Sequence, residues 1–247
     1  MINEAARLSA LNPADPYRWA MIIGIGLSVL FWWRLSKRDS RLFIIYITAL
    51  LSAFLGGKIV YILSEGWLYW NSPWRWIILA TGKTIIGALL GGYLGVEFAK
   101  NALGYTKPTG DWFASLAPAG VALGRVGCLL HGCCLGARCE PAWYAMRDSH
   151  GIPRWPAVPV EFGFNLLACA VFWIMRRKKI LPGQHFHLYL ISYGLFRFIH
   201  EFWRDTPQIL AGLSGYQITA LIVVVLGAVR FAQRAKVSLV ELSIDCS

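Results

Sequence analysis

The sequence predicts an all-α integral membrane fold with seven transmembrane helices, an interfacial segment and an outer cysteine-rich loop. Three observations support this. Hydrophobic residues make up 57% of the 247-residue chain and charged residues only 15%, against about 25% charged residues in soluble domains. The apolar residues gather in runs of roughly bilayer-spanning length. The basic residues, which bring the net charge to +11, lie in short segments between those runs, a placement that argues against a nucleic-acid partner. We expect one membrane domain over residues 1–247.

The predicted helices follow one another along the whole chain. They fall at about residues 19–33, 42–63, 84–99, 112–130, 160–175, 187–203 and 216–232. The first, third and fifth runs are short for a membrane span. No cleavable signal peptide is expected before them, because the first eighteen residues are polar.

Two features surround the third predicted helix. The segment 66–76, which precedes it, is rich in tryptophan and is broken by Pro73, so we expect it to lie in the membrane interface. The helix itself carries Gly87, Gly91 and Gly95 at four-residue spacing. Such a stripe indicates close helix packing, and the alternative is that it leaves room for a lipid headgroup.

Lysine and arginine residues predict the orientation of the helices, because short cytoplasmic loops carry an excess of them. The basic groups are Arg34, Lys37, Arg38 and Arg41 after the first run, residues 176–179 after the fifth, and Arg230, Arg234 and Lys236 in the C-terminal segment. Placing these groups inside leaves the N-terminus outside and the C-terminus in the cytoplasm. Loops 131–159 and 204–215 then face outside.

Charged side chains within the apolar runs mark the predicted functional centre: Lys58, Arg125 and the pair Arg197 and Glu201. A charge at membrane depth costs about 2.5–3.5 kcal/mol on transfer scales, so it usually has a function. Arg197 and Glu201 are four residues apart and share a helix face, with Arg204 beyond them. One interpretation is a self-neutralising pair that lets the helix enter the bilayer. The other is a clamp in which Arg125 and Arg197 bind a phospholipid phosphate, with Glu201 orienting them or accepting a proton.

Four cysteines lie within twelve residues of the fourth run and the loop that follows it: Cys128, Cys133, Cys134 and Cys139. A structural disulfide is one interpretation, because the compartment outside the membrane is oxidising. A metal site with His131 is the second, although Cys-x4-Cys-Cys-x4-Cys is not a standard zinc spacing. The third is a reactive thiol whose pKa is lowered by the nearby Arg125. The pattern leaves all three open.

Two motifs resemble the signature segments of the prolipoprotein diacylglyceryl transferase family. They are Gly124-Arg125-x-Gly127, followed by Gly132 and Gly136, and Tyr193-Gly194-x-x-Arg197-Phe198-x-x-Glu201-Phe202-x-Arg204. Weaker similarities are Gly57-Lys58-Ile59-Val60-Tyr61, where the family tends to have arginine, the glycine-rich third helix, and Pro159-Val160-Glu161 at the start of the fifth run. The resemblance spans nearly the whole chain.

The resemblance implies an enzyme of the bacterial inner membrane. It would transfer the diacylglyceryl group of phosphatidylglycerol to the lipobox cysteine thiol of a preprolipoprotein, or to another thiol acceptor, and release glycerol phosphate. The resemblance implies Arg125 and Arg197 as the essential pair, with Tyr193, Glu201 and Gly136 in support. Our expected catalytic residues are Arg125, Arg197, Glu201 and Cys133, and the expected substrate-binding residues are Tyr193, Arg204, Cys128, Gly136, Lys58 and Lys83. The arginines would stabilise negative charge on the departing phosphate. No metal and no cofactor are expected.

The chain departs from the family pattern at three positions. The histidine that the family usually has before the glycine-rich helix is Ile86, with Lys83 as the nearest ionisable group. The usual asparagine is Cys128 and the usual glutamate is Cys133. Two alternatives follow: the same fold acting on a different acceptor through its own cysteines, or a non-enzymatic membrane protein that handles thiols or metals.

Overall fold

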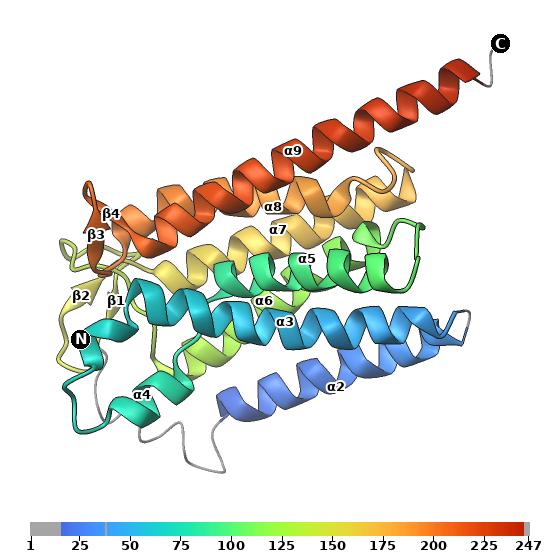
Figure 1. Cartoon of the computed structure of the whole chain (residues 1–247). Coiled ribbons are helices and arrows are strands. Elements are labelled where there is room, and N and C mark those ends of the chain that lie inside the picture. The colour runs from blue at the N-terminus through green and yellow to red at the C-terminus, as the bar shows by residue number, and fades with distance from the viewer. Residues whose placement is uncertain (1–15, 38, 245–247) are drawn as a thin grey trace.

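A computed structural model describes residues 16–37 and 39–244 and shows a bundle of long antiparallel helices (Figure 1). The long helices are α2 (Pro16–Ser36), α3 (Arg41–Ser64), α5 (Ile85–Ala102), α6 (Gly110–His131), α7 (Ala157–Arg177), α8 (His185–His200) and α9 (Gly215–Ile244). Each predicted run lies on one of these helices, so the apolar periods of the sequence locate the elements correctly.

Several of these helices meet the requirements for crossing a membrane. In the described part of the chain, α3, α6, α7 and α9 are long and apolar enough, and α4 with α5 adds a fifth span if this bent pair counts as one. The helix α8 has only 16 residues, and three histidines and an arginine are among them. The structure therefore supports a multi-pass membrane protein, while seven spans stay a prediction.

The glycine stripe of α5 packs directly on α3. A Cβ atom on Gly91 would lie 2.9 Å from the Cα of Gly56, and one on Gly95 would lie 2.5 Å from the Ser52 side chain. Such distances leave no space for a side chain, so the two backbones approach as closely as small residues allow. The packing interpretation of the stripe is confirmed.

The tryptophan-rich segment forms a 3-10 turn, η1 (Gly66–Tyr69), and a short helix, α4 (Arg75–Thr81), which meets α5 at 57°. Trp67, Trp70 and Trp76 are more than half exposed. Lys58 of α3 fixes the end of α4, because its ammonium donates hydrogen bonds to the carbonyl oxygens of Leu79 (2.6 Å), Ala80 and Gly82 (2.9 Å).

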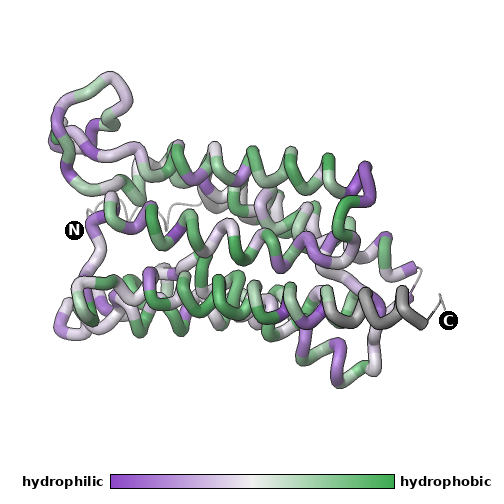
Figure 2. Tube along the Cα trace, turned by 90° about the horizontal axis from the view of Figure 1, so that it is seen from above, coloured by the Kyte–Doolittle hydropathy of each residue, from purple (hydrophilic) through white to green (hydrophobic). Residues whose placement is uncertain are grey.

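The two ends of the bundle differ. One end carries the loops between α3 and α5, α6 and α7, and α8 and α9, whereas the basic loops lie at the other end (Figure 1). Green, hydrophobic segments run along the helices between these polar ends (Figure 2). Large apolar side chains are exposed there, as expected of a surface that faces lipid: Leu51, Phe98, Leu167 and Val225 are each at least 60% exposed.

One detail of the prediction is wrong. The sixth predicted helix was expected to reach residue 203, but α8 ends at His200 and continues as a 3-10 turn, η2 (Glu201–Trp203). The N–H of Glu201 is shared between the carbonyls of Arg197 and Ile199, which tightens the last turn. The loops contain two short antiparallel hairpins, about which the sequence makes no prediction. These are β1 (Met146–Arg147) with β2 (Pro153–Arg154), and β3 (Gln208–Leu210) with β4 (Leu213–Ser214).

Candidate active site

Five charged side chains are buried together where α6, α7, α8 and η2 meet the hairpin end of the bundle. They are Arg125, Glu161, Arg197, Glu201 and Arg204, whose side chains are each 12% exposed or less. The helices α6, α7 and α8 alternate in direction. The C-terminal ends of α6 and α8 and the N-terminal end of α7 therefore lie at the same end of the bundle (Figure 1). We call this group the arginine cluster.

Glu161 forms one half of the arginine cluster. Its Oε2 lies 2.6 Å from Nη2 of Arg125, and its Oε1 accepts a hydrogen bond of 2.7 Å from the hydroxyl of Tyr193. The carboxylate is completely buried. Three different helices are thus joined at one side chain, which the sequence marks only as the start of a helix. An unpaired acid in the first turn of an apolar run was the signal that could have identified it.

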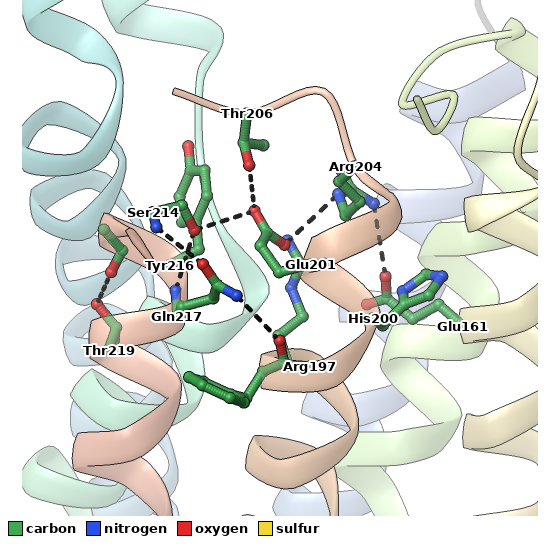
Figure 3. Close-up of polar contacts among 12 residues, drawn as sticks. Glu161, Arg197, His200, Glu201, Arg204, Thr206, Ser214, Tyr216, Gln217 and Thr219 are labelled. Carbon is green, nitrogen blue, oxygen red and sulfur yellow. Dashed lines mark hydrogen bonds and ion pairs between the residues drawn. The ribbon is translucent and has the colours of Figure 1, made fainter. Parts of the chain in front are cut away.

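The other half is centred on Glu201. Its Oε2 lies 2.7 Å from Nη2 of Arg197, and its Oε1 accepts a hydrogen bond of 2.8 Å from Thr206. Arg204 lies between the two carboxylates, with Nε 3.8 Å from Glu201 Oε2 and Nη1 3.9 Å from Glu161 Oε2 (Figure 3). The five side chains therefore form one continuous network.

The arginine cluster has more cationic donors than acceptors. Three guanidinium groups face two carboxylates, which leaves a formal surplus of one positive charge. Among the described residues, four donors of the cluster are buried without a hydrogen-bond partner: Nε of Arg125, Nη1 of Arg197, and Nε and Nη1 of Arg204. One acceptor, Oε2 of Glu201, also lacks a hydrogen bond and is held by ion pairs alone. Burial, together with repulsion from Arg197 and Arg125, lowers the pKa of Arg204. Buried polar groups are normally satisfied, so these orphaned donors indicate a site for an anion.

A small cavity gives the cluster an opening. It has a volume of about 60 Å³ and lies beside the β3–β4 hairpin. Its lining is polar and includes Glu201, Arg204, Thr206, Ser214 and Gln217. A larger cavity, of about 170 Å³, lies elsewhere, and no residue of the arginine cluster lines it.

Gly136 joins the loop between α6 and α7 to the cluster. Its N–H donates to the carbonyl of Trp155 (3.0 Å), and the N–H of the next residue, Ala137, donates to the carbonyl of Trp203 (2.8 Å). The two indole rings stack 5.6 Å apart. Trp155 also donates from Nε1 to Nε2 of His200, a buried residue (3.2 Å). The long cysteine-rich loop is thereby held against η2.

Three thiols converge next to Arg125. The Sγ atoms of Cys128, Cys133 and Cys134 all lie within 4.8 Å of one another, and the Cys128 Sγ is 3.9 Å from Nη1 of Arg125. These residues, with Cys139 and Cys169, are free cysteines in the structure. We call the first three the thiol cluster.

The remaining predicted residues lie around these two clusters. Lys83, in the linker before α5, is within electrostatic range of Cys128. Lys58 caps α4 as described, with its ammonium directed at three backbone carbonyl oxygens. Ile86 is fully buried in the core of α5. The structure therefore brings Arg125, Arg197, Glu201, Arg204 and Tyr193 into one network, with the cysteines beside it; the role of each residue stays a prediction.

Fold and site together define a multi-pass helical membrane protein. Its buried arginine cluster, with unpaired hydrogen-bond donors, lies at one end of the helical bundle. The prolipoprotein diacylglyceryl transferase family model matches residues 13–233, so the chain belongs to that family, whose members are transferases. The suspected resemblance is thus confirmed.

Three curated relatives illustrate the similarity. A phosphatidylglycerol–prolipoprotein diacylglyceryl transferase 2 of Clostridium perfringens is 29% identical over 232 residues, covering 86% of this chain and 88% of the relative. Transferases of the same name from Mannheimia succiniciproducens and Dehalococcoides mccartyi are 30% and 28% identical, covering 76% and 89% of this chain and 70% and 89% of their own lengths. The similarity therefore extends over most of each protein.

Proposed function

We propose that this protein transfers the diacylglyceryl group of phosphatidylglycerol to the lipobox cysteine thiol of a prolipoprotein and releases glycerol phosphate. The observation that carries the proposal is the surplus of buried, unpaired guanidinium N–H groups in the arginine cluster. A phospholipid phosphate supplies the negative charge and the acceptor oxygens that these donors lack. The names of the relatives, which refer to both substrates, support the same assignment.

The arginines would act on the leaving group. The acceptor thiol loses its proton to solvent, and its sulfur attacks the glycerol carbon. The bond from that carbon to the phosphate oxygen breaks, and this oxygen keeps the electron pair. Arg125 and Arg197 are held by Glu161 and Glu201 at 2.6 and 2.7 Å, so their donors are fixed before the charge develops. Such preorganised donors stabilise a departing anion more than water does.

Tyr193 and Arg204 would support this arrangement. The Tyr193 hydroxyl occupies Oε1 of Glu161, which leaves Oε2 to hold Arg125. Arg204 bridges the two carboxylates at distances too long for hydrogen bonds, so its donors remain available to substrate oxygens. Because the cavity opens beside it, Arg204 is the arginine that an entering headgroup meets first.

The reaction would take place at the outer face of the bacterial inner membrane. The basic loops lie at the end of the bundle opposite to the arginine cluster, which supports a cytoplasmic location for that end and an external active site (Figure 1). With seven spans, the N-terminus is outside and the C-terminus is cytoplasmic. The tryptophan-rich segment 66–76 then lies in the outer interface.

The alternative in which a cysteine of this chain accepts the lipid itself is disfavoured by chemistry. Attack by an enzyme thiolate on the glycerol carbon forms a thioether, which is not a leaving group for a second transfer. A purely structural role for the arginine cluster is also disfavoured. A structural ion-pair network would satisfy its own hydrogen-bond donors, whereas several guanidinium N–H groups of this cluster have no partner.

The test is transfer to a lipobox peptide by purified protein in vesicles that contain phosphatidylglycerol. Arg125→Ala and Arg197→Ala each remove one donor group and are expected to lower kcat by about 10²–10³-fold. Replacement by lysine should restore only part of the rate, because an ammonium lacks the planar fork. Arg230→Ala, at the opposite end of the bundle, is the control and should retain the rate. Full activity of Arg125→Ala and Arg197→Ala would contradict the proposal.

A further inference from the structure

We propose that Cys128, Cys133 and Cys134 form a catalytic metal site for a thiophilic cation such as Zn²⁺, whose open fourth position takes the acceptor thiol. The inference rests on the proposed transferase function and deepens it, because it identifies the group that deprotonates the acceptor thiol. It differs from a structural zinc site, which is closed by four protein ligands.

The sulfur positions fit a metal. Zinc–sulfur bonds of about 2.3 Å in tetrahedral geometry place two sulfur ligands about 3.8 Å apart. The three Sγ atoms already lie within 4.8 Å of one another, so a contraction of about 1 Å or less completes the set. Rotation of thiol side chains about their Cα–Cβ bonds accomplishes such a change without moving the backbone.

The backbone is arranged to bring the thiols together. Cys128 lies in the last turn of α6, which Gly132 ends in the left-handed conformation at φ 64°. The N–H of Cys133 bonds back to the carbonyl of Cys128 at 3.2 Å. Cys134 also has a positive φ, of 61°, which is uncommon for a residue with a Cβ atom. Left-handed residues on either side of Cys133 thus fold the adjacent cysteines onto the end of the helix.

The number of ligands indicates a catalytic site. Among the described side chains, which do not include that of His131, the group that can share one ion comprises three cysteines and no carboxylate. Zinc enzymes typically supply three protein ligands and leave the fourth position to water or substrate. A thiol that binds there loses its proton, because metal coordination deprotonates it outright. The substrate of the proposed reaction is itself a thiol that must become a thiolate.

The thiol cluster is also placed correctly for the reaction. One guanidinium group, that of Arg125, contacts Cys128 through Nη1 at 3.9 Å and Glu161 through Nη2 at 2.6 Å. The metal-bound sulfur would therefore lie beside the proposed phosphate site. Lys83 is within electrostatic range of Cys128 and offsets part of the thiolate charge.

The chemical step balances without a redox partner. The acceptor thiol releases a proton when it binds the metal, and its sulfur then forms the bond to the glycerol carbon. The carbon–oxygen bond to the phosphate breaks, and the glycerol phosphate oxygen keeps the electron pair. The released proton goes to solvent. The thioether product binds zinc more weakly than a thiolate does, so it can dissociate.

The first experiment measures metal alone. Full-length protein, reduced and freed of metal by a chelator, is titrated with Co²⁺ and with Zn²⁺. We expect one equivalent to bind, with sulfur-to-cobalt charge-transfer absorption. Cys128→Ser, Cys133→Ser and Cys134→Ser should each lose the absorption, whereas Cys139→Ser and Cys169→Ser should keep it. Failure of Co²⁺ to bind the reduced protein, or unchanged absorption in the three serine variants, would overturn the proposal.

The second experiment connects the metal to transfer. Chelated protein should transfer diacylglycerol to a lipobox peptide about 100-fold more slowly, and Zn²⁺ alone should restore the rate. Binding of phosphatidylglycerol vesicles should not change. Full transfer by protein shown to contain no metal would overturn the catalytic role. If no transfer occurs with or without zinc while one cobalt still binds, the transferase function fails and the metal site stands.

Discussion

At the scale of single residues, Glu161 compensates the positive charge of the buried arginines. It pairs with Arg125 and Tyr193 and lies at ion-pair distance from Arg204. Removing one partner of a buried ion pair typically costs about 3–5 kcal/mol, because the other charge is left without compensation. Glu161 is therefore both a stabilising residue and the one that positions the arginines.

Glu161→Gln tests this dual role. The substitution keeps the shape of the side chain but removes the charge that holds Arg125. We expect diacylglyceryl transfer to fall by about 10²-fold or more and the free energy of unfolding to fall by about 3 kcal/mol. Transfer to a lipobox peptide and thermal unfolding in detergent provide the two measurements. Glu97→Gln, whose carboxylate is 32% exposed and lies 3.9 Å from Arg230, is the control. Unchanged transfer and unchanged unfolding would rule out the assigned role.

The sequence predicted the arginines better than it predicted their partners. Arg125, Arg197 and Glu201 stand out because charges are rare within apolar runs. Glu161 did not stand out, since it begins a run rather than interrupting it, and its partner is 36 residues away along the chain. The sequence shows that the cysteines of the thiol cluster lie close together along the chain. Their meeting in space depends on the left-handed residues Gly132 and Cys134, which the cysteine spacing does not predict.

At the scale of elements, hydrophobic runs located the long helices, because a bilayer requires apolar stretches of a fixed length. Hydrophobic runs do not predict the structure of the polar loops. The hairpins β1–β2 and β3–β4 are only two or three residues per strand, and no alternation of that length can be distinguished from a turn. The early end of α8 was missed because residues 201–203 are as aromatic as the helix before them.

Gly136→Ala tests how the loop between α6 and α7 is held to the proposed active site. The added Cβ would lie 2.6 Å from the Trp155 carbonyl oxygen and 2.8 Å from that of Trp203, both backbone atoms. We expect the stacked indoles to separate, at a cost of about 1–3 kcal/mol, and transfer to fall with them. Gly163→Ala meets nothing within 4 Å and is the control, which should retain activity. Thermal unfolding, tryptophan fluorescence and peptide transfer check both variants, and equal behaviour of the two would contradict the expectation.

At the scale of the whole molecule, the bundle is polarised. Reactive groups gather at the hairpin end, and basic loops gather at the other end, so the direction of the chain in the membrane fixes where chemistry occurs. The larger cavity, lined by residues such as Glu97, Lys100 and Arg234, lies apart from the arginine cluster. Cavity size alone would therefore have pointed away from the proposed active site.

The orientation is tested with single cysteines in a background whose native cysteines are serine. Trp143→Cys, at a position that is 96% exposed in the outer loop, should react with a membrane-impermeant maleimide in intact spheroplasts. Lys178→Cys, in a basic loop, should react only after the membrane is permeabilised. Labelling in the opposite order would overturn the proposed topology, and with it the external active site.

The pairing of charges also has a consequence for biosynthesis. Arg125 leaves the ribosome on α6, and its partner Glu161 follows on the next long helix, whereas Arg197 carries its partner Glu201 four residues later. The hairpin of α6 and α7 thus enters the translocon with both Arg125 and its partner Glu161. The segment that contains Arg197 also contains its partner Glu201. A nascent chain that ends at Arg177 already contains the acid that α6 needs, and only a chain cut before α7 would present an orphaned arginine to membrane quality control.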